Sequence, residues 1–393
     1  MSVREIAPRI WAVGVNHPER KTFDALVPLP YGTSYNSYLV QGSEATALID
    51  SVDPEKFGDL LGNLEEVGIP KLDYIVANHA EQDHSGSIPE LLKRNTQAKV
   101  LTNQRCAAFL GDLLHIPAER IHVVKDEEEV DLGGKILKFI PAAWAHWPET
   151  MFTWEPSSRI LFSCDFMGAH LPTAQSFSSE EPRTGSELRS YYATIMMPYA
   201  RQISKHLDVF DKYSVALVAP SHGPMHDKPE EPLSLYRRWL GEELSKDVVV
   251  IYVSMHGSSE VLAHALVKKL SDLGVKVHLF NLCQDGLGEI AAALLESPTL
   301  ICVSPVVLGG LHPVMIGALT TINLLKPPTK MVGCLLSYGW GPRGVEQVKA
   351  LLGNLKADFL DPILVKGLPR LEDLAQLDGL VAQIKQACAA VSQ

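Results

Sequence analysis

Two imidazoles and two carboxylates occupy six residues of the stretch YIVANHAEQDHSGS, as His79, Glu81, Asp83 and His84. They directly follow the apolar run 74–77, which predicts a buried strand. His79 and Glu81 can face the same way on an extended segment, and Asp83 with His84 adds groups around a turn. Without a cation, convergence of the four would leave carboxylates repelling each other beside desolvated imidazoles. The pattern therefore indicates a metal site in preference to an ordinary solvated loop.

Three further candidate ligands follow other predicted strands: His146 in AWAHWPETMF, Asp165 in LFSCDFMGAH and His222 in VAPSHGPMH. Loops at one rim of a sheet sandwich can converge, so these side chains are expected near the first four. Seven ligands exceed what one tetrahedral ion needs, and we expect two ions that share Asp165 as a bridging carboxylate. His226 is the alternative to His222 as the last ligand.

The surrounding sequence changes character near Ser245. Residues 1–245 contain many short strand-like runs with few helical patterns, which predicts two packed sheets flanked by helices. From Asp247 onward strand and helix alternate five times, which is typical of an open parallel sheet with helices on both faces. We therefore predict two domains, 1–245 and 246–393.

The segments quoted above resemble a known family. HAEQDH is similar to the metallo-β-lactamase-fold motif H-x-H-x-D-H with its second histidine replaced by Glu81, and that replacement is the hallmark of the flavodiiron proteins. The resemblance extends over FDALVPLPYGTSYNSYLV, AHWPETMF, SCDFMGAH and APSHG. It implies an α+β metallo-β-lactamase-like αββα sandwich followed by an α/β flavodoxin-like doubly wound parallel sheet.

Carried over residue by residue, the resemblance implies that one iron takes His79, Glu81 and His146, and the other Asp83, His84 and His222, with Asp165 bridging. Exchanging an imidazole for a carboxylate makes the site harder and favours iron over zinc.

Three loops of the second domain resemble FMN-binding loops: VSMHGSSE before the first helix, SPVVLGGLHP after the third strand and SYGWGP after the fourth. A helix N-terminus after a parallel strand is a common phosphate site. The ring would lie against Tyr338 or Trp340, and Leu308 stands where the family commonly has Asn. The implied FMN contacts are Ser254, Met255, His256, Gly257, Ser258, Ser259, Ser304, Pro305, Val306, Val307, Leu308, Gly309, Gly310, Leu311, Ser337, Tyr338, Gly339, Trp340 and Gly341.

The expected activity is reduction of dioxygen to water, of nitric oxide to nitrous oxide, or of both. No donor domain follows Gln393, so we expect a separate electron donor: a rubredoxin, another small carrier or a reduced deazaflavin. The resemblance also implies a head-to-tail homodimer or a dimer of dimers. The alternatives are a dizinc hydrolase with a flavodoxin-like accessory domain, which Glu81 disfavours, and an electron carrier with an inert metal domain.

Composition excludes other classes. A net charge of -11 and a pI near 5.7 argue against nucleic acid or an anionic membrane as the main partner. The six cysteines are scattered and form no C-x-x-C pair, and the N-terminus lacks a long apolar core, so we expect a cytoplasmic protein. The run 297–325 carries no charge, but its prolines and glycines favour a strand, a loop and a helix over a membrane span.

Overall fold

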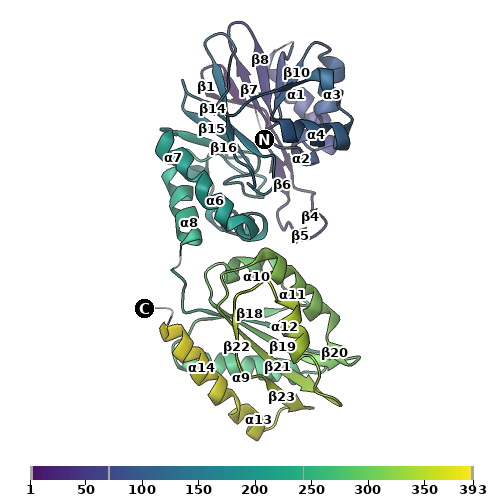
Figure 1. Cartoon of the computed structure of the whole chain (residues 1–393), viewed down its shortest axis with the longest axis vertical. Coiled ribbons are helices and arrows are strands. Elements are labelled where there is room, and N and C mark those ends of the chain that lie inside the picture. The colour runs from purple at the N-terminus through teal and green to yellow at the C-terminus, as the bar shows by residue number, and fades with distance from the viewer. Residues whose placement is uncertain (1–2, 70, 242, 391–393) are drawn as a thin grey trace. The chain divides into compact units, whose positions relative to one another are not determined.

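The structure is a computed structural model, which describes residues 3–69, 71–241 and 243–390 (Figure 1). It forms two compact units. Unit 1 comprises the chain up to Tyr192 together with Tyr199–Leu240, and unit 2 comprises Ala193–Pro198 together with the chain from Gly241 onward.

Unit 1 is built on two sheets that pack face to face. Their strand orders are β1-β2-β7-β8-β9-β10-β11 and β12-β13-β14-β15-β16. Side chains alternate along the strands, so Tyr38 and Val40 on β7 join Phe139 and Phe162 between the sheets, whereas Leu39 faces the outer helices. The first sheet consists of β1 (Arg4–Ala7), β2 (Ile10–Ala12), β7 (Tyr38–Gln41), β8 (Thr46–Ile49), β9 (Tyr74–Val76), β10 (Lys99–Thr102) and β11 (Ile121–Val123); the second consists of β12 (Glu129–Asp131), β13 (Ile136–Pro141), β14 (Met151–Glu155), β15 (Ile160–Cys164) and β16 (Leu217–Pro220).

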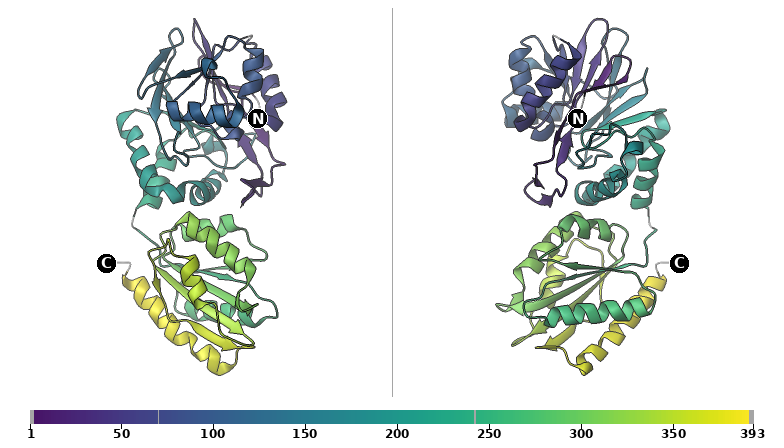
Figure 2. Two further views of the ribbon diagram at one scale, coloured as in Figure 1. Left: turned by 45° about the vertical axis from the view of Figure 1, so that its right-hand side comes forward. Right: turned by 180° about the vertical axis from the view of Figure 1, so that it is seen from behind.

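Helices cover the outer faces of both sheets, so unit 1 has four layers in the order αββα (Figures 1 and 2). On the first sheet, Leu60 and Leu110 pack against Ile75 in one apolar core. On the second, Tyr236 contacts Phe166 with ring centroids 5.1 Å apart. The helices are α1 (Phe57–Val67), α2 (Gln82–Ser85), α3 (Ile88–Arg94), α4 (Gln104–Leu114), α5 (Thr184–Tyr191), α6 (Ala200–His206), α7 (Asp208–Lys212) and α8 (Glu230–Leu240).

Two small antiparallel pairs complete unit 1. They are β3 (Val15–His17) with β6 (Thr33–Tyr35), and β4 (Thr22–Phe23) with β5 (Val27–Pro28).

Unit 2 is an open parallel sheet in the order β18-β17-β19-β21, with β22 and β23 pairing successive parts of β21. In chain order this is 2-1-3-4-5, the order of a flavodoxin-like sheet. Its main elements are β17 (Val248–Tyr252), α9 (Ser258–Asp272), β18 (Val277–Asn281), α10 (Leu287–Leu294), β19 (Thr299–Val307), β20 (Gly310–Leu311), α11 (Pro313–Leu325), β21 (Met331–Tyr338), α12 (Val345–Leu351), β22 (Asp358–Phe359), β23 (Ile363–Lys366), α13 (Leu371–Ala375) and α14 (Leu377–Ala390).

Both faces of this sheet are buried, as the uninterrupted apolar strands predict. Val249 and Ile251 on β17 pack with α10, α11 and α12, whereas Val248 and Val250 pack with α9 and α14. Figure 2 shows α9 and α14 on one face of the sheet. The loops after β17, β19 and β21 consequently lie at one edge, because these three parallel strands are neighbours.

The charge-free run 297–325 forms strand β19, the short β20 and helix α11, as expected from its prolines and glycines. Within the described residues, no helix combines the length and apolar character that crossing a membrane requires.

Candidate functional site

Seven histidine, aspartate and glutamate side chains converge at one rim of the unit 1 sandwich. They come from the ends of strands in both sheets, because β9 belongs to the first sheet and β15 and β16 to the second. All seven are buried. In chain order they are His79 and Glu81 after β9, Asp83 and His84 on α2, His146 between β13 and β14, Asp165 after β15 and His222 after β16.

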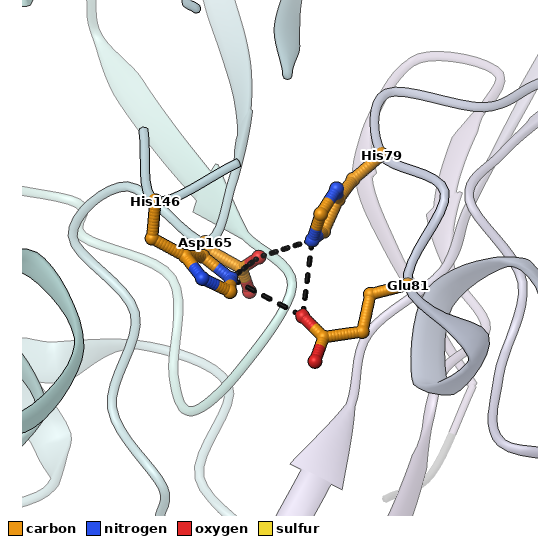
Figure 3. A group of neighbouring side chains, drawn as sticks. All are labelled: His79, Glu81, His146 and Asp165. Carbon is orange, nitrogen blue, oxygen red and sulfur yellow. Dashed lines mark hydrogen bonds and ion pairs between the residues drawn. The ribbon is translucent and has the colours of Figure 1, made fainter. Parts of the chain in front are cut away.

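Four of these side chains form the first set, drawn in Figure 3: His79, Glu81, His146 and Asp165. Glu81 Oε2 lies 3.0 Å from His79 Nε2 and 3.2 Å from His146 Nε2. Asp165 Oδ2 lies 3.1 Å from His146 Nε2 and 3.6 Å from His79 Nε2. Two imidazole nitrogens and two carboxylate oxygens therefore face a common point, which is a donor set suited to a divalent metal.

Asp83, His84 and His222 form the second set, on the other oxygen of Asp165. Asp165 Oδ1 lies 3.1 Å from His84 Nε2 and 3.3 Å from His222 Nε2. Both oxygens of Asp83 and both of these Nε2 atoms are buried, and among the described residues they make no hydrogen bond. Buried polar atoms that face each other without hydrogen-bond geometry are expected where a cation belongs.

Electrostatics point the same way. Burial opposes protonation of the imidazoles, but the negative charge of the neighbouring carboxylates outweighs it and raises the pKa of His146 to about 9 and that of His222 to about 10. Although burial acts in the opposite direction, the surrounding histidines hold the pKa of Asp165 well below its usual range. The carboxylates thus demand compensating positive charge, which metal ions supply without protonating the ligand nitrogens.

Hydrogen bonds orient two histidines of the cluster, one in each set. His79 Nδ1 donates to Glu149 Oε1 over 2.7 Å, and His222 Nδ1 donates to the Ser34 carbonyl over 2.6 Å. Tyr191 donates to Asp165 Oδ1 over 2.9 Å. The sequence reasoning missed these supporting residues. Only Glu149, the one carboxylate in AHWPETMF, carried a signal that could have drawn attention to it.

A buried carboxylate, Asp50, also holds the loop that carries His79. Its two oxygens accept from the Asn78 backbone N–H over 2.8 Å and from Asn78 Nδ2 over 3.0 Å. Ser221 Oγ, next to His222, lies 3.4 Å from Asp50 Oδ2. Asp50 therefore ties together the segments that immediately precede two of the clustered histidines.

His226 lies outside the cluster. Its Nε2 donates to the Met167 carbonyl over 2.8 Å, and its backbone pairs with Val218. Gly223 lets the chain turn sharply between the two histidines, with φ of +77° and no room for a Cβ beside the backbone of Ala169. Of the two candidates, the structure brings His222 to the other six side chains.

The three loops predicted to hold FMN lie at one edge of the unit 2 sheet, after β17, β19 and β21. Gly257, with φ of +89°, is the N-cap of α9, and its N–H donates to Ser254 Oγ over 3.1 Å. The Ser259 hydroxyl in the first turn is buried and has no hydrogen-bond partner among the described residues. Leu308 and Trp340 are 98% and 85% exposed. A helix N-terminus with an unpaired hydroxyl, at the same edge of the sheet as exposed apolar side chains, fits a phosphate attached to a flat ring.

Together, this sandwich and this sheet define a class of protein in which a metallo-β-lactamase-like domain precedes a flavodoxin-like one. Residues 33–223 match the family model described as ODP family beta lactamase. The chain is 34% identical to the nitric oxide reductase of Moorella thermoacetica, covering 87% of this chain and 88% of that protein. It is 35% identical to the coenzyme F420H(2) oxidase of Methanothermobacter marburgensis, over 72% of each.

Solved structures agree over nearly the whole chain. The rubredoxin oxygen:oxidoreductase of Desulfovibrio gigas superposes with a TM-score of 0.95 at 28% identity, covering 99% of both chains. The flavodiiron protein of Giardia intestinalis gives 0.94 at 26% identity, covering 100% of this chain and 98% of that one. The chain belongs to the flavodiiron protein family. It is an oxidoreductase with FMN and a non-haem diiron pair as cofactors, and the dizinc hydrolase alternative is set aside.

Proposed function

We propose that this flavodiiron protein reduces dioxygen, nitric oxide or both at a diiron centre held by the seven clustered side chains. One iron would be bound by His79, Glu81 and His146, and the other by Asp83, His84 and His222. The observation that carries the proposal is Asp165, whose two oxygens each face a separate set of ligands. A carboxylate with this arrangement is suited to bridging two ions.

When bound, the flavin and the iron pair would supply electrons one or two at a time. Four electrons and four protons turn one dioxygen into two waters. Two electrons and two protons turn two nitric oxides into one nitrous oxide and one water. Glu149 orients His79 toward the first set of ligands, and the Ser34 carbonyl orients His222 toward the second. Tyr191 holds one oxygen of the proposed bridge. Three ligand carboxylates offset the charge of the cations and keep the buried site close to neutral.

For FMN, we propose that the phosphate binds at the N-terminus of α9, where Gly257, Ser258 and Ser259 begin the helix, with the ring between the loops 304–311 and 337–341. Ser259 supports this assignment because its buried hydroxyl is unpaired among the described residues. Tyr338 and Trp340 are the candidates for stacking on the ring, and Trp340 is the more exposed of the two.

The electron donor is proposed to be a separate molecule: a rubredoxin, another small carrier or a reduced deazaflavin. Two similar proteins support this choice by their names: one is a rubredoxin oxygen:oxidoreductase and the other a coenzyme F420H(2) oxidase. We also propose a head-to-tail homodimer or a dimer of dimers, in which the flavin of one subunit serves the iron pair of another. An active monomer by light scattering would contradict it.

A domain boundary near Ser245 and a cytoplasmic location complete the proposal. The boundary rests on the change from strand-rich sequence to alternating strands and helices. The location is supported by the cysteines at 106, 164, 283, 302 and 334, which are free thiols, as expected in a reducing compartment.

The first experiment is elemental analysis with a visible spectrum, both scaled to protein concentration. About two irons and one FMN per chain are expected. Anaerobic stopped-flow mixing of the reduced protein with dioxygen or with nitric oxide should then show which gas reoxidises it. Failure to consume either gas would overturn the proposed activity.

A further inference from the structure

Glu149 is a buried carboxylate directly behind one of the proposed iron ligands. Its side chain is fully buried, and its Oε1 accepts hydrogen bonds from His79 Nδ1 over 2.7 Å and from the Ala80 backbone N–H over 3.1 Å. The Asn103 amide donates to the backbone carbonyl of Glu149, which holds this turn in front of β14. Glu149 therefore fixes the ring plane of His79 and directs its Nε2 toward the cluster.

We infer that Glu149 is a positioning residue that also makes the two iron positions unequal, an inference that rests on the proposed diiron centre. A carboxylate that accepts the N–H of a ligating histidine makes the imidazole a stronger donor to the metal. Glu149 acts in this way on the iron bound by His79, Glu81 and His146. That iron is bound more tightly and is the more strongly stabilised in its ferric state.

The second iron position has no equivalent support. His222 Nδ1 donates to a neutral backbone carbonyl, that of Ser34. His84 Nδ1 is buried without a hydrogen bond in the described part of the chain. Each set has one carboxylate of its own, Glu81 or Asp83, and both share Asp165. Among the described residues, Glu149 is thus the carboxylate outside the cluster that accepts a hydrogen bond from one of the clustered imidazoles, and it does so in the first set alone.

A purely structural brace would not need this charge. Both hydrogen bonds go to Oε1, whereas Oε2 is buried and has no partner among the described residues. An amide would keep one accepting oxygen without burying a negative charge, and an unused buried carboxylate oxygen is costly. The carboxylate is explained when its charge faces, through His79, a cation bound at the cluster.

The test compares wild type with Glu149→Gln, which preserves shape and removes the charge. Ferrous iron binding would be measured anaerobically by chelator competition, which yields two stepwise dissociation constants. We expect one constant to weaken by about 10- to 100-fold and the other to change less than threefold. Redox titration followed by electron paramagnetic resonance should show a higher reduction potential for the iron pair.

Glu155→Gln is the matched control, because Glu155 is equally buried and lies at the far end of β14, bonded to Ser157 and Ser158. It should leave both constants and the potential unchanged. Glu149→Asp keeps the charge but shortens the side chain, so it should weaken the same constant less than the glutamine does. If Glu149→Gln does not fold, Glu149→Asp decides the matter against wild type: weakening of one constant alone supports the inference, and equal weakening of both constants, or of neither, overturns it.

Equal constants and potentials in wild type and Glu149→Gln would overturn the inference. Equal weakening of both constants, or the same losses in Glu155→Gln, would show a structural role only and overturn it as well. A wild-type protein that binds no iron pair would instead refute the proposed diiron function, and the inference with it.

Discussion

Replacing His222 should remove an iron, whereas replacing His226 should lower stability and leave both irons in place. Both side chains are buried and they are only four residues apart. His222 Nε2 lies 3.3 Å from both Asp83 Oδ2 and Asp165 Oδ1. His226 Nε2 instead donates to the Met167 carbonyl over 2.8 Å. We expect His222→Ala to retain about one iron per chain, and His226→Ala to retain both.

The cost of His226→Ala follows from its contacts. The variant leaves the buried Met167 carbonyl without its donor, which costs about 1–3 kcal/mol, and loses about 1 kcal/mol or more of side-chain packing. The free energy of unfolding should therefore fall by about 2–4 kcal/mol. Urea unfolding of the metal-free protein can measure this loss in unit 1, because five of the six tryptophans belong to it: Trp11, Trp144, Trp147, Trp154 and Trp239.

Iron would be counted by elemental analysis against protein concentration in variants purified identically. Flavin content is the internal control, since FMN is expected in unit 2 and should stay near one per chain. Loss of an iron from His226→Ala, together with two irons in His222→Ala, would refute the assignment. An unfolding free energy unchanged in His226→Ala would refute the structural role given to that residue.

Three further predictions concern other parts of the molecule. Asp50→Ala should lower the free energy of unfolding of metal-free unit 1 by about 2–4 kcal/mol, because two buried Asn78 donors lose their acceptor. Ser259→Ala should weaken FMN binding about tenfold, the value of one charge-assisted hydrogen bond, in a fluorescence titration. Arg183 lowers the pKa of Glu181 to about 2 in the folded protein, compared with about 4.3 in the unfolded chain. The ionised Glu181 side chain therefore stabilises the fold above about pH 4.3, and this stabilisation is lost as the pH falls toward 2. Glu181→Gln should remove that part of the pH dependence of the thermal midpoint in the metal-free protein.

Each of these predictions has its own control. Asp50→Asn keeps one accepting oxygen and should cost less than the alanine; equal costs would contradict the hydrogen-bond argument. Ser259→Ala should leave flavin-free stability unchanged, because the hydroxyl has no partner among the described residues, and unchanged FMN affinity would count against the phosphate assignment. If the thermal midpoint of Glu181→Gln drops as much as that of wild type when the pH is lowered from 5 to 3, other carboxylates dominate the pH dependence of stability.

Local patterns in the sequence predicted the fold class and the candidate ligands. Strands with apolar side chains on both faces predict a covered parallel sheet, and β17 divides its residues between two cores in that way. His79, Glu81, Asp83 and His84 could be selected because they are crowded directly after a strand. That crowding depends only on chain order and on the chemistry of carboxylates and imidazoles.

Helical structure between 184 and 212 was not predicted, although Leu188, Tyr191, Tyr192 and Ile195 stand at helical spacing and only Pro198 interrupts the pattern. The structure has α5, α6 and α7 there, with a π-helix at Tyr192–Met196 between the first two. The segment Ala193–Pro198 groups with unit 2, although its neighbours on both sides belong to unit 1. Membership of a compact unit is decided by contacts between distant residues, and no local pattern records them.

The sequence by itself determined which residue types follow which strands, and therefore that a metal centre and a phosphate-binding loop were to be expected. Tertiary structure alone placed His222 in the cluster and His226 outside it, because the sharp turn at Gly223 and the pairing of His226 with Val218 set their directions. It also brought Glu149 to His79 across 70 residues of chain. Such contacts arise when two sheets pack and their loops meet at one rim, and packing depends on the whole folded chain.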